Sequence, residues 1–369
     1  MVSNEKMIQP VIEYIHKQGG AITYSEYMNL VLYHPELGYY SKREQKIGKD
    51  GDFYTSSNVS DIFPKVFAKL FSRLVKSGAA EPAFCELGGG TGRFLTAMLH
   101  EWQELSPETF KILNVYSAEK SEFHRELQLS SIKIQRHTSV SSISELPKPY
   151  RGILFSNELF DAFPVEVIEK RHNQLFEVYI SFNQERGLVE KLEPLKNDKI
   201  RNYLDWQNIQ LSEGQRFEIP LAMLEYLDEI NALAEQAVIV TIDYGYSNKE
   251  WHHPARFEGS MRGYFRHKMM TPLERPFEMD LTAHIHFDAL EKRAEEFGWR
   301  LLKRERQDLF LVNAGILSYL KENGELNPFG EAAKQNRAIR SLIMPEGMSS
   351  SFQVYIHEKG TNLQGKDIY

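Results

Sequence analysis

Cysteine is almost absent from this sequence, with Cys85 as its single representative among 369 residues. One thiol excludes an intramolecular disulfide and any zinc site built on several cysteines. Such sparse use of cysteine is typical of a reducing compartment, and we expect a cytoplasmic location. Long apolar runs are lacking too. No stretch approaches the roughly 18 residues of a spanning helix or has the make-up of a signal peptide, so membrane insertion is not expected.

An excess of basic residues is also missing, because 44 lysines and arginines face 51 acidic residues, for a net charge of -7. Nucleic-acid-binding domains usually carry a basic face, so the composition gives no support for RNA or DNA as a partner. A basic protein or peptide suits this charge better. Apolar residues make up 42% of the chain, which is enough to form a hydrophobic core without support from disulfide bonds or structural metal ions. No interface signature stands out, which leaves the oligomeric state open, a homodimer included.

The first 78 residues are predicted to form helices around a loop. Apolar periodicity favours helices over Tyr24–Leu32 and Asp61–Lys76, with a loop-like stretch over Gly48–Ser60 between them. We assign residues 1–78 to an N-terminal helical segment that acts as a lid over the site.

Beyond Pro82 the pattern changes to strands that alternate with helices. Strands are predicted over Ala83–Leu87, Ile112–Ala118, Ile132–Gln135, Gly152–Ser156 and Val238–Asp243. Such alternation favours a parallel sheet with helices on both faces. We therefore predict an α/β, Rossmann-like core over residues 79–175 and 236–369. Its last part should contain helix Phe287–Phe297, strand Arg300–Arg304, two helices between Val312 and Leu342, and strand Phe352–Ile356.

An insertion interrupts this core between the fourth and fifth predicted strands, which are roughly 80 residues apart. That distance is too long for one crossover helix. Val178–Phe182 and Leu188–Leu192 are predicted as extra strands, and Pro220–Ala234 as a helix. We assign residues 176–235 to an inserted subdomain on the substrate side of the sheet, and we expect Tyr244–Asp280 to be irregular.

The sequence Glu86-Leu-Gly88-Gly-Gly90-Thr-Gly92 stands where the first core strand ends and a helix begins. Ligands of open α/β sheets bind there, glycines allow the backbone to approach them, and the helix start offers free N–H groups. A nicotinamide loop needs a small residue at the sixth place, which Arg93 occupies here. The acidic residue before the glycines favours S-adenosylmethionine instead. We assign Glu86 and glycines 88, 90 and 92 to this cofactor; a NAD site and a purely structural turn are the alternatives.

Glu119 ends the second predicted strand. A carboxylate at that place can accept two hydrogen bonds from a ribose diol, which both NAD and S-adenosylmethionine carry. We therefore predict that Glu119 binds the cofactor. The alternative is an ordinary carboxylate at a strand end.

A polar turn, Asn157-Glu158-Leu-Phe-Asp161-Ala-Phe-Pro164, follows the fourth predicted strand. Pro164 disfavours helix at Phe163, so the polar residues fall on a short turn beside the expected crevice. Glu158 and Asp161 would share a face of a helical turn and could hold a guanidinium through paired hydrogen bonds. Asn157 could hold an acceptor nitrogen or the cofactor. We predict all three as catalytic, and solvated carboxylates on a capped turn are the alternative.

Asp243 closes the fifth predicted strand, before Gly245. A substrate-side catalytic role and a simple Asx-turn are equally compatible with that position. Two histidine pairs, His252-His253 and His284-x-His286, match no trusted metal motif, so no metal is expected. The basic stretch Arg262–Lys268 contains aromatics and could contact an acidic peptide, although a solvated loop explains it as well.

The ordered set of motifs along the chain resembles the MidA-like family of class I S-adenosylmethionine-dependent methyltransferases. The motifs that carry the resemblance are Tyr33-His-Pro-Glu-Leu-Gly-Tyr-Tyr40, Gly51-Asp-Phe-Tyr-Thr55, Glu86-Leu-Gly88, Ser156-Asn-Glu-Leu-Phe-Asp-Ala-Phe-Pro164, Ile242-Asp-Tyr-Gly245, Arg262-Gly-Tyr-Phe-Arg-His267, Asp280-Leu-Thr-Ala-His284 and Leu342-Ile-Met-Pro-Glu-Gly-Met348.

This resemblance implies a seven-stranded sheet with its last strand antiparallel, and S-adenosylmethionine as cofactor. It also implies that Asp52, Tyr54 and Thr55 lie near the cofactor. Because a mitochondrial member of the family methylates an arginine of a respiratory-complex subunit, the resemblance implies a protein nitrogen as acceptor. Asn58 and His286 stand where the family carries acids. These two changes keep open an alternative role as a cofactor-binding assembly factor without turnover.

Overall fold

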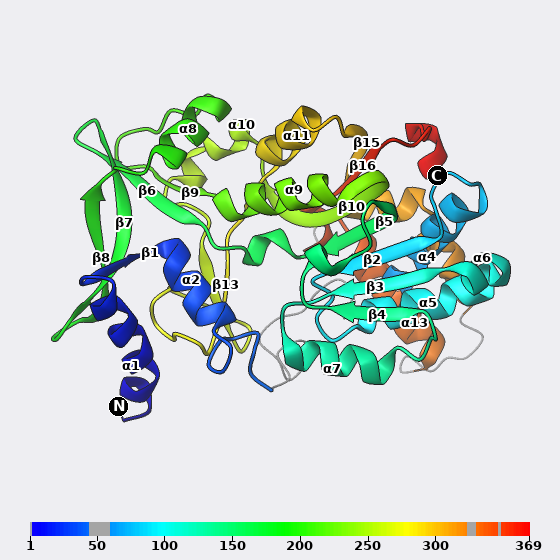
Figure 1. Cartoon of the computed structure of the whole chain (residues 1–369), viewed down its shortest axis with the longest axis horizontal. Coiled ribbons are helices and arrows are strands. Elements are labelled where there is room, and N and C mark those ends of the chain that lie inside the picture. The colour runs from blue at the N-terminus through cyan, green and yellow to red at the C-terminus, as the bar shows by residue number, and fades with distance from the viewer. Residues whose placement is uncertain (1, 44–59, 323–329, 346–347) are drawn as a thin grey trace.

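A mixed sheet forms the centre of the protein, in a computed structural model that describes residues 2–43, 60–322, 330–345 and 348–369. Its strand order is β15-β16-β10-β5-β2-β3-β4, and the short β14 pairs with the end of β10 (Figure 1). The strands are β2 (Ala83–Leu87), β3 (Asn114–Ala118), β4 (His137–Val140), β5 (Tyr150–Asn157), β10 (Ala234–Tyr246), β14 (Ile285–His286), β15 (Arg300–Arg306) and β16 (Phe352–Lys359).

The direction of the strands confirms the predicted methyltransferase-type sheet. β2, β3, β4, β5 and β10 pair in parallel, whereas β16 runs antiparallel to both β10 and β15. Parallel strands buried on both faces are rich in apolar residues, and Phe84, Cys85 and Leu87 of β2 are fully or almost fully buried. The register places Glu86 opposite Ser117 of β3 and Phe155 of β5, so the carboxyl ends of three strands meet at one edge.

Two apolar layers cover the faces of this sheet. One layer packs on Phe84, Phe155 and Val240, and the other packs on Leu154 and Ile239. The helices of the first layer are α4 (Ile62–Lys76), α5 (Arg93–Leu105), α6 (Pro107–Ile112), α12 (Gln307–Asn313) and α13 (Glu331–Ile343). Those of the second are α8 (Asp198–Gln207), α9 (Leu221–Leu233) and α11 (Phe287–Glu296). Helix α7 (Glu122–Ser131) lies beside β4.

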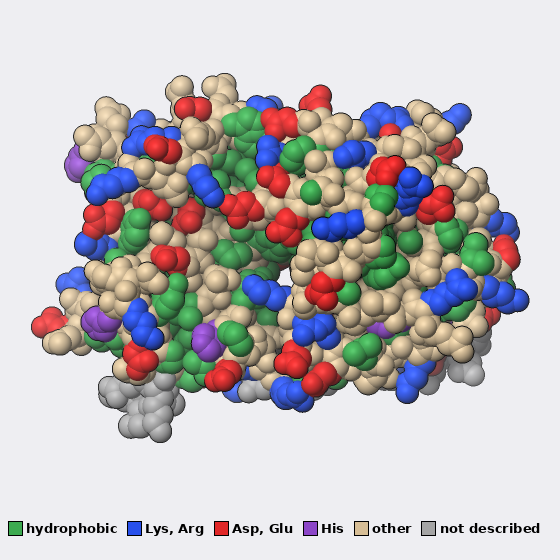
Figure 2. All heavy atoms as spheres, viewed as in Figure 1, with side chains coloured by type: hydrophobic (Ala, Val, Ile, Leu, Met, Phe, Trp, Pro, Cys, Tyr) green, Lys and Arg blue, Asp and Glu red, His purple; other side chains and the backbone are tan. Residues whose placement is uncertain are grey.

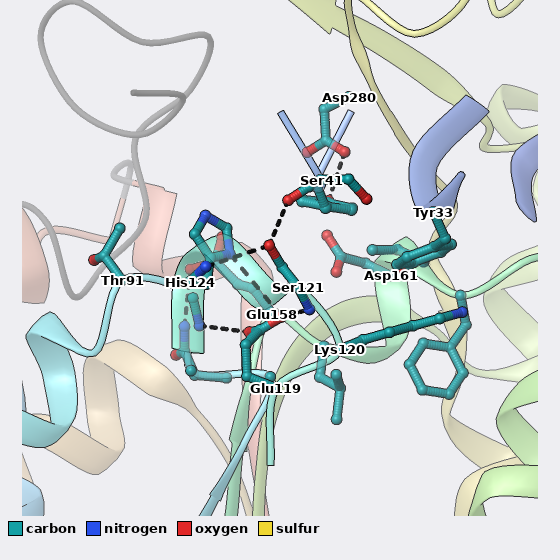
Figure 3. Close-up of a pocket in the computed structure, with 18 of the residues that line it drawn as sticks. Tyr33, Ser41, Thr91, Glu119, Lys120, Ser121, His124, Glu158, Asp161 and Asp280 are labelled. Atoms are coloured by element: carbon teal, nitrogen blue, oxygen red, sulfur yellow. Dashed lines mark hydrogen bonds and ion pairs between the residues drawn. The ribbon is translucent and has the colours of Figure 1, made fainter. Parts of the chain in front are cut away.

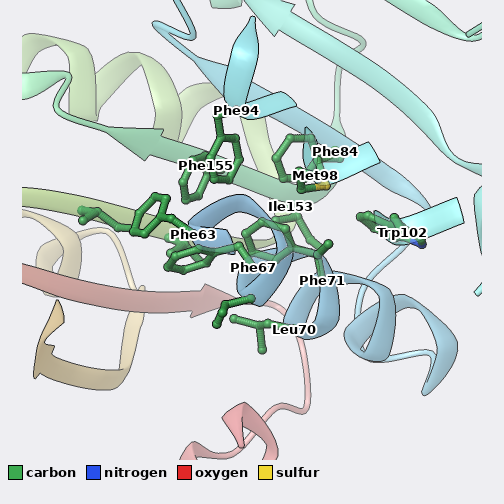
Figure 4. Close-up of a cluster of buried hydrophobic side chains, with 14 of the residues drawn as sticks. Phe63, Phe67, Leu70, Phe71, Phe84, Phe94, Met98, Trp102, Ile153 and Phe155 are labelled. Carbon is green, nitrogen blue, oxygen red and sulfur yellow. The ribbon is translucent and has the colours of Figure 1, made fainter. Parts of the chain in front are cut away.

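Aromatic rings fix the helices of the first layer against the sheet (Figure 4). Phe94, in the first turn after the glycine loop, stacks on Phe155 with the ring centroids 4.3 Å apart. Phe67 of α4 stacks on Phe310 at 5.5 Å and also contacts Phe155. The start of α5 is therefore held in place by rings from several other elements.

A second, five-stranded sheet combines the N-terminal segment with the sequence after Pro164. β1 (Ala21–Thr23) pairs antiparallel with β7, so residues far apart in the sequence share one sheet. Its remaining strands are β6 (Glu166–Arg171), β7 (Gln174–Asn183), β8 (Gly187–Pro194) and β9 (Arg216–Ile219), and α1 (Val2–Lys17) and α2 (Tyr24–Tyr33) lie beside it (Figure 1). The proposed division of the chain at residues 78, 175 and 235 stays a prediction.

Some element predictions are wrong. Residues 132–135 form no strand: Ile132 closes α7 and is buried as an apolar cap, and β4 begins at His137. Residues 112 and 113 precede β3 because α6 extends to Ile112. The first C-terminal helix, α12, begins at Gln307, five residues before the predicted start.

The stretch from 244 to 280, expected to be irregular, contains regular elements. They are α10 (Asn248–Trp251), β11 (Arg262–Phe265) and β12 (Lys268–Met270), and β13 (Asp280–Thr282) pairs with β11. Strands β6 and β9 and helix α8 were also not predicted, since short segments of mixed polarity show no clear period.

Replacing Phe67 with alanine should lower the free energy of unfolding by about 3–5 kcal/mol, because a fully buried ring leaves a cavity. Leu129→Ala is the control, as Leu129 is 58% exposed and should change stability by less than about 0.5 kcal/mol. Chemical denaturation monitored by circular dichroism measures both. Equal losses in the two variants would contradict the assignment of Phe67 to the core.

Candidate active site

A cavity of about 1640 Å³ opens at the carboxyl ends of β2, β3 and β5. Its walls come from the glycine loop, from the N-terminal segment and from β11 and β13. Sites for small ligands usually measure about 300–1,000 Å³, so this cavity exceeds what a nucleoside-sized cofactor fills. The predicted residues that line it are Glu86, Gly88, Gly90, Glu119, Asn157, Glu158 and Asp161.

The glycine loop turns sharply between β2 and α5. Gly88 and Gly92 have φ angles of 66° and 77°, in the left-handed region that glycine adopts readily. A Cβ atom built on Gly88 would lie 2.6 Å from Cδ1 of Leu159, and one on Gly92 would lie 2.8 Å from Cγ of Gln128. Gly92 precedes the first turn of α5, and no side chain caps this helix start.

Gly90 is held from two sides. Its N–H donates to Oε2 of Glu119 at 3.0 Å, and its carbonyl accepts a hydrogen bond from Nε2 of Gln128 at 2.8 Å. Gln128 is fully buried on α7, and sequence reasoning missed it because a glutamine in a helix has the signature of a surface residue. The loop is therefore tied both to the end of β3 and to α7.

Glu119 lies at the end of β3, as predicted. Its Oε1 accepts the N–H of Ser121 at 2.8 Å, while burial raises the pKa of the carboxyl above its ordinary value. Each carboxylate oxygen has more than one acceptor site, so the two backbone bonds leave capacity for a diol. The backbone fixes the orientation that a ribose would require.

Glu86 is buried directly beneath the loop. A Cβ built on Gly89 would lie only 2.3 Å from Oε2 of Glu86, and this oxygen has no hydrogen-bond partner among the residues that the structure describes. Burial and, secondarily, the negative charge of Glu119 raise the pKa of Glu86 well above its usual range. Such a carboxylate favours a ligand that brings positive charge or N–H donors, and S-adenosylmethionine brings both.

The turn after β5 carries backbone strain. Glu158 has a φ of 51°, a conformation that costs a residue with a side chain about 1–3 kcal/mol. Its N–H donates to the carbonyl of Ile242 at 2.9 Å, and its Oε1 accepts Nδ2 of Asn157 at 3.1 Å. Glu158 therefore reaches the cavity through a left-handed residue and not through a shared helical face. The short helix η2 (Phe160–Ala162) follows and ends before Pro164, as predicted.

Asp161 is 5% exposed and lies in η2. Its Oδ2 accepts the hydroxyl of Tyr244 at 2.6 Å, whereas Oδ1 has no partner within the described part of the chain. Burial raises the pKa of Asp161 to about 6, although the bond from Tyr244 opposes this shift. Oδ1 of Asn157 is similarly buried without a partner there.

Asp243 does not line the cavity. Its Oδ2 accepts the N–H groups of Phe160 and Asp161 at 3.0 and 3.4 Å, and its Oδ1 accepts the N–H of Tyr244 at 2.9 Å. Burial and the nearby charge of Asp161 raise the pKa of Asp243 well above its ordinary value. These contacts indicate that Asp243 supports the turn from behind, in place of the catalytic contact that we predicted.

The predicted residues Asp52, Tyr54 and Thr55 lie outside the described residues, as does Asn58. His286 is fully buried away from the cavity, where its Nδ1 lies 2.6 Å from the hydroxyl of Tyr203. The histidine at position 286, where the family resemblance predicts an acid, therefore affects packing in the core and does not change the lining of the cavity. In the described ranges no group of histidine, cysteine or acidic residues has an arrangement that could hold a metal ion.

Several residues of the cavity wall were not predicted as site residues (Figure 3). The ammonium of Lys120 lies 4.4 Å from the ring centroid of Tyr33, whose hydroxyl donates to the carbonyl of Ala162 at 2.8 Å. Tyr40 donates to Oδ1 of Asp280 at 2.6 Å. Tyr33 and Tyr40 belong to the family motif around Pro35, and Asp280 begins the family motif that ends at His284. The motifs marked these residues as important, but the spacing within each motif did not show that they meet in one cavity wall.

The sheet with β16 reversed, the glycine loop at β2 and the acidic residue at the tip of β3 define a class I, S-adenosylmethionine-dependent methyltransferase. Comparison with known families agrees. Residues 66–304, more than half of the chain, match the model of the S-adenosyl-L-methionine-dependent methyltransferase family Methyltransf_28, and the chain belongs to this family. Its cofactor is therefore S-adenosylmethionine, which settles the choice against NAD.

Relatives extend over nearly the whole chain. A Burkholderia thailandensis protein crystallised with S-adenosyl-homocysteine is 26% identical, with a TM-score of 0.87 over 98% of this chain and 94% of that one. The human protein arginine methyltransferase NDUFAF7, mitochondrial, is 27% identical over 98% of this chain and 86% of its own length. Its mouse counterpart is 26% identical over 92% and 81%. Among the described residues, no helix has the length and apolarity needed to span a bilayer.

Glu86→Gln should weaken the binding of S-adenosylhomocysteine about tenfold or more, because the ligand's ammonium group would favour ionisation of this carboxyl and an amide cannot supply the negative charge. The apoprotein should not lose stability, since the folded state no longer buries a carboxylate. The raised pKa means that the wild type loses stability relative to the variant as pH rises above about 4.5, the ordinary pKa of glutamate.

Calorimetry and thermal denaturation from pH 5 to 8 measure the two effects. Glu104→Gln, at an exposed position of the same loop–helix unit, is the matched control and should change neither quantity. A destabilised Glu86→Gln protein with unchanged ligand affinity would mean that Glu86 serves the fold alone.

Proposed function

We propose that the protein transfers a methyl group to a protein nitrogen, with the arginine side chain as the first candidate. The observation that carries this proposal is the pair of buried acceptor oxygens, Oδ1 of Asn157 and Oδ1 of Asp161, beside the cofactor loop. Both lack a partner in the described part of the chain, and N–H groups of an acceptor would supply one. The human and mouse relatives are described as protein arginine methyltransferases, which supports the same acceptor.

A macromolecular substrate is consistent with the size and chemistry of the cavity. At about 1640 Å³ it leaves space for a side chain and its flanking backbone after a cofactor is placed. Lys, Arg, Asp and Glu side chains are interspersed on the face drawn in Figure 2, and those drawn there do not gather into one basic area. This distribution favours a protein over a nucleic acid as the partner.

We assign the cofactor to Glu86, Gly88, Gly90, Gly92 and Glu119. Asp52, Tyr54 and Thr55 remain predicted contacts. S-adenosylmethionine, when bound, supplies an electrophilic methyl group on a positively charged sulfur. Glu119 would hold its ribose, and the glycines would let the backbone approach it closely. Glu86 would accept N–H groups of the cofactor, which would supply the partner that its buried oxygen lacks among the described residues.

The acceptor is assigned to Asn157, Glu158 and Asp161. Oδ1 of Asn157 would accept an N–H of the acceptor and turn the nitrogen lone pair toward the methyl carbon. The carboxylates of Glu158 and Asp161 would hold the remaining guanidinium N–H groups, and Asp161 would take the proton that nitrogen releases. Asp243 would act as a positioning residue, because it holds the backbone of Phe160 and Asp161. Positioning and charge placement dominate such an in-line transfer.

The pH dependence of turnover follows from Asp161. Its pKa of about 6 means that the carboxylate is ionised above pH 6 and protonated below it. We expect kcat/KM to fall as pH drops through 6 and to level off above it. Asp161→Asn should lower methyl transfer about 100-fold or more while the affinity for S-adenosylhomocysteine stays within about twofold. Stopped assays with radiolabelled cofactor across pH 5–8 measure this, and an Asp161→Asn enzyme with normal turnover contradicts the role.

The acceptor itself is identified by labelling. Native protein and radiolabelled S-adenosylmethionine are added to a lysate of cells that lack the chain, and the protein fraction is hydrolysed to amino acids. Label in methylarginine supports the proposal, and label in another amino acid overturns the choice of arginine. If no label is transferred by an enzyme that binds the cofactor, the alternative of an assembly factor without turnover is favoured.

The predicted location is the cytoplasm, because one buried cysteine in 369 residues suits a reducing compartment. The human and mouse relatives are described as mitochondrial, and cell fractionation decides between the two locations.

A further inference from the structure

Asp280 lies in the cavity wall opposite the cofactor loop, at the start of β13. Building on the proposed function, we infer that Asp280 is a second carboxylate of the acceptor subsite. Together with Asp161 and a wall of tyrosines, it selects a positively charged acceptor, the guanidinium group of a side chain.

Backbone hydrogen bonds join the elements that carry Asp161 and Asp280, although 119 positions separate the two residues in the sequence. The N–H of Ala283, just after β13, donates to the carbonyl of Asp161 at 2.9 Å and joins this strand to η2. On its other side β13 pairs with β11, which places Asp280 opposite Tyr264. Asp280 is 3% exposed, so its carboxylate is as deeply buried as that of Asp161. Figure 3 shows both side chains beside Tyr33.

Tyrosines surround this pair of carboxylates. Tyr33, Tyr40 and Tyr264 each have a raised pKa, chiefly through burial, and the charges of both Asp161 and Asp280 contribute to each shift. All three hydroxyls therefore stay protonated, and their rings remain neutral. Neutral aromatic faces beside carboxylates favour a flat cation, which can stack on a ring while its edges donate hydrogen bonds.

Two independent observations indicate that this part of the cavity accepts a cation. Oδ1 of Asp161 is buried in the cavity wall without a partner among the described residues. A cation of the chain itself, the ammonium of Lys120, already lies over the ring of Tyr33 at 4.4 Å. Two carboxylates on separate elements can bind two edges of one guanidinium, whose five N–H donors lie in a plane. An uncharged acceptor would leave the buried oxygen of Asp161 without a charged partner.

The competing interpretation is that Asp280 only anchors Tyr40, whose hydroxyl it accepts at 2.6 Å. Tyr40→Phe removes this anchor and keeps the carboxylate, whereas Asp280→Asn removes the charge and keeps an oxygen for Tyr40. Glu278→Gln is a matched acid-to-amide control two residues away, since the Glu278 carboxylate pairs with Arg275 on the half-exposed surface.

Two synthetic probes test the inference without turnover. In both, the 5′ position of adenosine carries an alkyl chain that reaches into the cavity and ends in guanidine or in urea, its uncharged isostere. Calorimetry measures both compounds and S-adenosylhomocysteine on the wild type and the three variants. The affinity for S-adenosylhomocysteine shows whether a variant still folds and keeps its cofactor loop intact. The ratio of the affinities for the guanidine and urea compounds shows whether the acceptor subsite still prefers a positive charge.

The wild type should bind the guanidine compound at least about tenfold more tightly than the urea compound. Asp280→Asn should reduce this ratio about tenfold and leave S-adenosylhomocysteine binding within twofold. Tyr40→Phe and Glu278→Gln should preserve the ratio. The inference is overturned if the wild type shows no preference, if Asp280→Asn keeps it, or if Tyr40→Phe lowers it as much. Label in an amino acid other than arginine, with the preference intact, would instead overturn only the proposed function.

Discussion

The burial of carboxyl groups at the carboxyl ends of adjacent parallel strands is the constraint on which the whole site depends. Glu119 and Asp243 have their oxygens tied to backbone N–H groups, which offsets the cost of their burial. Glu86 and Asp161 each keep one buried oxygen without a partner among the described residues. A ligand that brings positive charge and N–H donors is therefore stabilised at two places. This pattern fits a sulfonium cofactor on one side and a cationic acceptor on the other.

The fold makes this arrangement rigid before ligands arrive. Stacking of Phe94 on Phe155 fixes the first turn of α5, so the glycine loop cannot rotate away from the sheet. The strained backbone of Glu158 persists because its N–H is tied to Ile242 on the neighbouring strand β10. Binding energy from the substrates need not be spent on ordering these elements, and catalysis benefits most from such preorganised dipoles.

The sequence allowed the sheet, the glycine loop and the polar turn to be predicted, because each is encoded over a few consecutive residues at a strand end. Gln128 and Asp280 could not be found in this way, since their roles arise from contacts with residues 38 and 240 positions away. Asp243 illustrates a different limit. Its position at a strand end suggests chemistry, yet the hydrogen bonds that define its role come from the backbone of a distant turn.

The N-terminal segment belongs to the site and not merely to its cover. Ser121 donates its N–H to Glu119 and its hydroxyl to the carbonyl of Tyr40, so one residue touches both the expected ribose position and the N-terminal segment. The hydroxyl of Tyr40 in turn donates a hydrogen bond to Asp280, and the hydroxyl of Tyr33 donates one to the carbonyl of Ala162. Hydrogen bonds through this segment thus link the cavity wall at Glu119 to the wall at Asp280. The N-terminal segment therefore builds part of the cavity wall, through the backbone carbonyl of Tyr40 on one side and the hydroxyls of Tyr33 and Tyr40 on the other.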